Sequence, residues 1–166
     1  MVIRCTAPVL KAMGTRVATL ASADFEPDDI YVTMIEADRK RCVVAMHAQT
    51  LLSVTVRDVR TAQLRHLGSL LGIEFDQLLR DMVLPTDLIV VSPQAPITAA
   101  ASHGLAGALS EIERAVADQL TDGYVMDLDI RALNLEMQEV AHLGAGDKVT
   151  PRSRAMALWE RRLMAG

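Results

Sequence analysis

Aromatic side chains are scarce in this sequence and make up only 3% of its 166 residues. Hydrophobic residues nevertheless account for 51%, a share that excludes an intrinsically disordered chain. The core must therefore be built from leucine, valine, isoleucine, alanine and the nine methionines. The length is sufficient for a substantial core, and we predict a single domain that comprises residues 1–166.

Cysteine is also scarce, because Cys5 and Cys42 are the only two. Two cysteines are too few for a disulfide scaffold or a four-cysteine zinc site, so we predict free thiols in a cytoplasmic protein. No apolar run reaches the roughly 18–20 residues that a membrane span needs. The N-terminal residues lack the basic and apolar pattern of a signal peptide, and we expect no association with a membrane.

An excess of positive charge is missing as well, since the net charge is −4 and gives no global attraction for nucleic acid or anionic membranes. The histidines lack the spacing of a zinc site. Asp127 and Asp129 have the spacing of a magnesium motif, but Asp129 is better explained as a helix cap. Residues 144–150 lack the order of a phosphate-binding loop, so we expect neither a metal nor a cofactor.

The most informative stretch is residues 30–57, the only long segment that is rich in β-branched side chains. Its alternating pattern predicts strands at 30–36, 41–47 and 51–57, and the two short polar turns between them make the strands antiparallel. The second strand is apolar on both faces, which is typical of a central strand that is covered on both sides.

The third of these strands alternates between apolar and polar side chains. We predict that Leu52, Val54 and Val56 face the core, while Ser53 and Thr55 face water or a partner.

Helical spacing and helix-breaking residues predict the other elements. Helices follow the strands in the chain, so we predict an α+β fold, an antiparallel meander sheet of three to four strands covered by several helices. Residues 93–104 read as an irregular linker, and residues 105–166 as helical. The predicted elements are a strand at 2–5, a buried strand at 88–91 that could join the sheet as its fourth, and helices at 7–13, 58–71, 74–83, 105–120, 130–143 and from Pro151 onward.

Several features of residues 30–114 resemble a small bacterial family that is catalogued only as a domain of unknown function. They are a basic turn at 39–41, an apolar strand that ends near His47, a third strand that begins Thr-Leu-Leu-Ser at 50–53, and a helix that begins at 58–64. The family has a polar Thr-Asn-Arg-Ser-like segment before the long helix, whereas residues 98–104 lack the asparagine and the arginine. The resemblance implies an α+β fold and a soluble prokaryotic protein, and it implies no activity.

The candidates for catalysis are His47 and His66, which could approach each other near the third strand and do acid–base work. We favour the interpretation that each is a half-exposed polar histidine. The candidates for nucleic-acid binding are Arg39, Lys40, Arg41 and Arg57, and we favour solubilising roles for them because the chain is acidic and has almost no aromatic side chains for base stacking.

The final helix has Met156, Trp159 and Leu163 on one side, at helical spacing. We expect this stripe to pack on the domain itself or on a second chain, and tryptophan and methionine are favoured at such contacts. Our first hypothesis is therefore a non-enzymatic cytoplasmic module that binds a protein partner or forms a homodimer. The alternative is a nucleic-acid-directed protein, either an RNA-cleaving toxin or a regulator, that uses the basic hairpin and a histidine.

Overall fold

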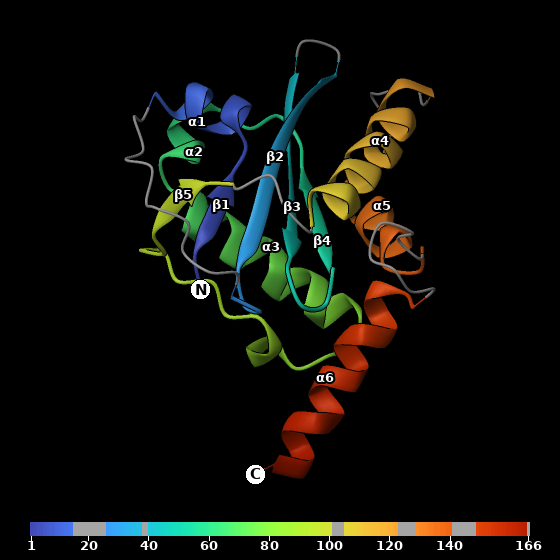
Figure 1. Ribbon diagram of the computed structural model, residues 1–166. Coiled ribbons are helices and arrows are strands. Elements are labelled where there is room, and N and C mark those ends of the chain that lie inside the picture. Colours follow the sequence, from blue (N-terminus) through green and yellow to red (C-terminus); the bar gives the residue numbers. More distant parts are fainter. Residues whose placement is uncertain (15–25, 38–39, 101–104, 123–128, 141–148, 166) are drawn as a thin grey trace.

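The computed structural model describes residues 1–14, 26–37, 40–100, 105–122, 129–140 and 149–165 (Figure 1). These residues form an α+β fold around one five-stranded sheet. The elements are β1 (Ile3–Cys5), α1 (Ala7–Met13), β2 (Ile30–Ala37), β3 (Lys40–His47), β4 (Ser53–Val56), α2 (Thr61–Leu64), α3 (Leu67–Asp81), the 3-10 helix η1 (Thr86–Leu88), β5 (Ile97–Ala99), α4 (Ala106–Asp122), α5 (Ile130–Met137) and α6 (Pro151–Ala165).

The predicted meander is confirmed as the centre of the sheet. β2 pairs with β3 in antiparallel register from Ile30 opposite His47 to Ala37 opposite Lys40, and β3 pairs with β4 in the same sense. The third strand is shorter than predicted, because Leu51 adopts a positive φ of 61° and β4 begins only at Ser53. This tight turn returns the chain directly alongside β3.

The sheet is mixed, which corrects the prediction of an antiparallel sheet of three to four strands. Its order is β4-β3-β2-β1-β5, and β1 pairs in parallel with both β2 and β5. The parallel pairing of β1 with β2 follows from α1, whose crossover returns the chain to the same end of the sheet. β5 then adds a parallel edge strand on the other side of β1.

Residues 88–91 do not form the predicted buried strand. Leu88 ends η1, while Ile89 and Val91 are buried in the core without a partner strand in the sheet. The edge strand is instead β5, within the segment that the sequence predicted to be an irregular linker. Apolar burial and strand pairing are separate properties, and the sequence pattern indicated only the burial.

The two helices predicted at 58–71 and 74–83 divide at a different place. The break lies between α2 and α3, near His66, and α3 continues through Gly72. Close packing explains the glycines of α3: a Cβ at Gly68 would lie 2.5 Å from the carbonyl oxygen of Ser92, and one at Gly72 would lie 3.2 Å from that of Val91. Both glycines therefore let α3 approach the backbone of residues 91–93.

Helices cover the sheet on both faces (Figure 1). One apolar core joins side chains of α1, α2, α3 and α6 to one face, and a second joins α4 and α5 to the other. The alternation of β3 matches this arrangement, since Val43 and Ala45 lie in the first core while Val44 and Met46 lie in the second. β3 is thus buried on both sides, as predicted.

The polar face of β4 is buried as well, which corrects the expectation that Ser53 and Thr55 face water. Leu52 and Val54 lie in the first core as predicted, Val56 is half-buried against it, and α5 covers the opposite face of the strand. Two side-chain amides, that of Asn134 in α5 and that of Gln138 directly after it, bind the backbone of β4. The meander therefore has no solvent-facing side at β4.

Several local predictions are confirmed. α1 ends at Gly14 in the left-handed conformation, and Asp129 caps α5 by accepting hydrogen bonds from the backbone amides of Arg131 and Ala132. α5 is shorter than the predicted 130–143. Asp127 and the loop at 144–148 lie outside the described residues, as does Arg39 of the basic turn. No helix in the described ranges is both long and apolar enough to cross a membrane.

Candidate functional site

The two candidate catalytic histidines lie at opposite ends of the sheet. His47 ends β3, whereas His66 follows α2 at the end where Arg41 donates a hydrogen bond to Thr61. β4 runs between these two ends, so the third strand that was expected to bring the histidines together instead separates them. The structure therefore gives no support to acid–base catalysis by this pair.

The expectation that both histidines are half-exposed is wrong, since His66 is exposed and His47 is fully buried. The hydrogen bonds of His47 indicate its tautomer. Its Nδ1 accepts a hydrogen bond from the backbone N–H of Thr50 at 3.4 Å and lies 2.9 Å from the Thr50 hydroxyl. The proton of the neutral ring is therefore on Nε2, which has no hydrogen-bond partner among the described residues and lies 3.8 Å from a carboxylate oxygen of Asp28. This arrangement holds the turn between β3 and β4.

The free energy of unfolding is expected to fall in mild acid because of His47. Burial lowers the pKa of His47 to about 4, although the carboxylate of Asp28 acts in the opposite direction. The unfolded chain binds the proton at an ordinary pKa near ~6.5, so the stabilising effect of the neutral ring is complete above that pH and is lost as the pH falls toward 4. We expect a loss of about 2 kcal/mol at pH 5 relative to pH 8.

Urea unfolding of the wild type and of His47→Gln across this pH range measures the effect. The substitution should flatten the pH dependence between pH 4 and about 6.5, the window of the two pKa values. An equally steep dependence in His47→Gln would assign the acid sensitivity to other groups. The titration of His47 itself can be followed by the chemical shifts of its ring.

A buried ion pair joins β1 to the start of β2. Arg4 Nε donates to Asp29 at 2.6 Å, and the two side chains are 4% and 0% exposed. Asp29 also accepts hydrogen bonds from the backbone amides of Val2 at 2.8 Å and Glu26 at 3.2 Å. Its own carbonyl accepts a hydrogen bond from the backbone N–H of Ala48, in the turn that follows His47. Asp29 thus joins three segments of the fold.

The described candidates for nucleic-acid binding, Lys40, Arg41 and Arg57, do not all lie on one face of the sheet. Arg41 pairs with Glu36 across the hairpin, at 4.0 Å between Nε and the carboxylate, and its side chain lies on the sheet face that carries α1. Lys40 and Arg57 act electrostatically on Cys42, whose side chain lies on the opposite face. Alternate residues of a strand point to opposite faces, so this placement follows from the pairing of β3.

Both thiols are buried, and burial raises their pKa. The pKa of Cys5 rises to about 12. Both are therefore protonated at neutral pH, a state that is inert as a nucleophile. The described ranges also contain no group of three side chains that could hold a metal ion.

A cavity of about 600 Å³ lies between α1 and the β2–β3 hairpin. Its apolar lining comes from Ala7, Pro8 and Ala12 of α1 and from Met34 of β2. Lys11, Glu36 and Arg41 contribute charged groups. Of these residues, sequence reasoning singled out only Arg41, since the cavity results from the relative lengths of paired elements rather than from a motif.

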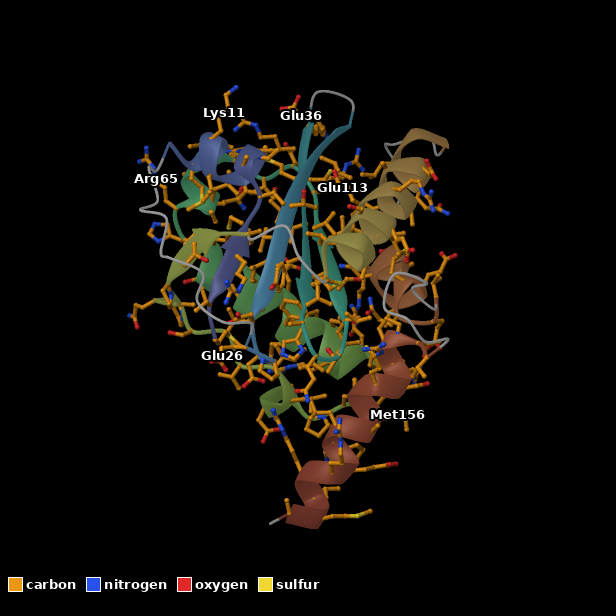
Figure 2. All side chains as sticks on the ribbon, viewed as in Figure 1. Lys11, Glu26, Glu36, Arg65, Glu113 and Met156 are labelled. Atoms are coloured by element: carbon orange, nitrogen blue, oxygen red, sulfur yellow. The ribbon has the colours of Figure 1, made fainter. Side chains whose placement is uncertain are left out.

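The stripe predicted on the final helix divides between the core and solvent. Trp159 is half-buried and packs against the first core, next to the buried Leu158. Met156 is 42% exposed and Leu163 is 66% exposed. Met156 projects from α6 toward solvent, and the C-terminal part of α6 extends away from the sheet (Figures 1 and 2).

These observations define a small α+β domain with a mixed sheet between two layers of helices. The chain belongs to the family described as "Domain of unknown function (DUF6933)", whose model matches residues 2–154. This result confirms the predicted resemblance and extends it from 30–114 to most of the chain. No curated protein and no solved structure matches the chain.

Proposed function

We propose that the chain is a non-enzymatic interaction module that self-associates, and that two copies meet through α6. The single observation that carries this proposal is a self-complementary row of exposed residues on that helix. Arg152, Met156 and Glu160 follow one another at intervals of four residues, so they form one ridge along the helix surface. All three are exposed.

The order of these residues suits a symmetric pair. A twofold axis at Met156 would place the two copies of α6 antiparallel, with Met156 against the same residue of the second copy. Arg152 of each copy would then face Glu160 of the other, at both ends of the contact. A twofold contact requires one patch to complement itself, and this row meets that condition.

The exposed apolar side chains of α6 support the same proposal. Leu163 lies seven residues after Met156 and therefore on the same side of the helix. Met164 beside it is 88% exposed. Three large apolar side chains on the exposed surface of one helix form a surface that is stabilised when water is excluded from it.

Trp159 plays a different part in this proposal. It packs on the domain's own core, and the guanidinium of Arg162 donates to the backbone carbonyl groups of Asp87 and Leu88. These contacts fix α6 to the domain and leave the Arg152–Met156–Glu160 row facing outward. Substituting Trp159 would perturb the fold as well as an interface, so exposed charges give the sharper test.

Sedimentation equilibrium of charge-reversal variants tests the proposal. Arg152→Glu and Glu160→Arg should each weaken association by about tenfold or more, because each places like charges opposite one another. The double variant Arg152→Glu/Glu160→Arg should regain the wild-type association. Arg152 also pairs with Glu139 on its own chain at 2.9 Å, an exposed contact that contributes less than about 1 kcal/mol.

The matched control is Arg80→Glu, which reverses an exposed arginine on α3, far from the row in sequence. It should leave the association unchanged. A wild type that remains monomeric at high concentration contradicts the proposal. So does a dimer that tolerates both single reversals, since its contact would lie elsewhere.

A further inference from the structure

The β2–β3 hairpin is longer than the strand beside it, and this difference creates the cavity next to α1. Within β2, only Ile30, Tyr31 and Val32 pair with β1. The rest of β2 extends beyond the end of β1, where α1 begins. α1 packs beside this extension, and the corner between them is the cavity of about 600 Å³, which we call the hairpin cavity. Its volume lies within the range of about 300–1,000 Å³ that is typical of small-molecule sites.

The residues of α1 that line the hairpin cavity explain why it stays open. Ala7, Pro8 and Ala12 present small side chains where larger ones would fill the corner. Met34 contributes an apolar surface from β2 and packs against the first core. A flexible thioether side chain at this position can adapt to apolar ligands of different shape.

Two cations from different elements border this apolar surface. Lys11 lies on α1, and the described part of the chain offers no ion-pair partner for it. Arg41 lies on β3, and its Nη1 donates to Thr61 at 3.2 Å. Glu36 is the one carboxylate of the lining, 4.0 Å from Arg41 Nε. Figure 2 shows Lys11 and Glu36 at the same end of the molecule. The hairpin cavity therefore has a net positive charge in a chain whose net charge is −4.

We propose that the hairpin cavity binds a small amphipathic anion, a carboxylate or phosphate monoester that carries a short apolar chain. Its charged group lies between Lys11 and Arg41, and its apolar chain lies on Met34 and Ala12. Arginine donates to carboxylate and phosphate oxygens through a planar fork, and lysine adds a compact charge. An inorganic anion would leave the apolar surface unused, and a neutral chain would leave the positive charge of Lys11 uncompensated.

Titration of the ¹⁵N-labelled protein with octanoate, octyl phosphate and octanol tests this proposal by site-resolved chemical shifts. At least one of the two anions should shift the amides of Lys11, Ala12, Met34 and Arg41 to saturation. Octanol should bind at least about tenfold more weakly, because it cannot form the charge-assisted hydrogen bonds. Tighter binding of octanoate or of octyl phosphate identifies the charged group as carboxylate or phosphate.

Variants distinguish binding in the hairpin cavity from unspecific adsorption elsewhere on the protein. Lys11→Met and Arg41→Met should each weaken the anion by about tenfold, and Ala7→Trp should abolish binding by filling the corner. Arg80→Met removes an exposed arginine on α3 and should leave binding unchanged. The amide spectrum of each variant also reports whether it is folded.

Three results would overturn the proposal. They are the absence of saturable binding of either anion, shifts that saturate away from α1 and the hairpin, and affinities that do not change in Lys11→Met and Arg41→Met. None of these results depends on α6 or on self-association, so this proposal and the proposed function can fail independently.

Discussion

Replacing Asp29 by asparagine is expected to lower the free energy of unfolding by about 3–5 kcal/mol. Asparagine keeps the shape of the side chain but removes the negative charge that lies against the Arg4 guanidinium, and so breaks a buried ion pair from one side. The neutral amide also accepts the backbone hydrogen bonds of Val2 and Glu26 less well than a carboxylate does. Urea unfolding followed by far-UV circular dichroism measures the change.

The neighbouring aspartate provides the matched control. Asp28→Asn makes the same chemical change one residue earlier, on a side chain that is 56% exposed. We expect its effect to stay within about 0.5 kcal/mol, as for other exposed positions. Equal losses in the two variants would show that the Arg4–Asp29 pair contributes nothing specific.

The position of Asp29 explains why its carboxylate contributes so much to the free energy of unfolding. It lies directly before β2, between the parallel pairing with β1 and the turn that follows His47. Three-residue β1 alone forms few backbone hydrogen bonds, so side-chain contacts to Val2 and Arg4 add to its attachment. The acid sensitivity expected from His47 and the stability expected from Asp29 therefore concern the same end of the sheet.

The central meander was predictable because its information is local. Alternating side chains and short polar turns determine which strands pair, and the structure has β2, β3 and β4 in that order. The same holds for α1 with Gly14 after it, and for Asp129 as the cap of α5. In each of these cases the residues that specify the element lie within it or next to it.

Features that depend on distant contacts were missed. β5 has three residues and no alternation, and only its pairing with β1 makes it a strand. Gly72 was predicted to end a helix, but its role is to admit the carbonyl of Val91. Ser53 and Thr55 were expected at the surface because their partners, Asn134 and Gln138, lie about eighty residues later in the chain.

The candidate surfaces on α6 and at the hairpin cavity were likewise predictable only where local sequence determines them. The stripe of Met156, Trp159 and Leu163 was readable from helical spacing, and so was the Arg152–Met156–Glu160 row, although only the stripe was predicted. The charge order of that row follows directly from the sequence. Which side of α6 packs on the domain was not readable, because it depends on η1 and the first core. The hairpin cavity depends on the relative length of two paired strands.

The second large loss of stability is expected on substitution of Gln138. Its side chain forms hydrogen bonds to the backbone of the edge strand β4, as a neighbouring strand would. Its side-chain amide accepts from Ser53 N–H at 3.1 Å and donates to the Ser53 carbonyl at 2.9 Å. Asn134 repeats this pattern at Thr55, with distances of 2.7 and 3.2 Å. The two amides thereby satisfy the backbone of β4 on the side where the described residues place no further strand, which protects a sheet edge from joining another chain.

Gln138→Met should therefore lower the free energy of unfolding by about 2–4 kcal/mol, since it keeps the side-chain volume but leaves a buried N–H and a buried carbonyl of Ser53 unpaired. Hydrogen exchange gives a local readout: the Ser53 amide should exchange faster in the variant, while the Thr55 amide keeps its bond to Asn134. Gln119→Met, at an exposed position of α4, makes the same chemical change and should have little effect on either measurement. If Ser53 exchange stayed slow in Gln138→Met, the backbone of β4 would have another partner and the amide of Gln138 would not be what protects this edge.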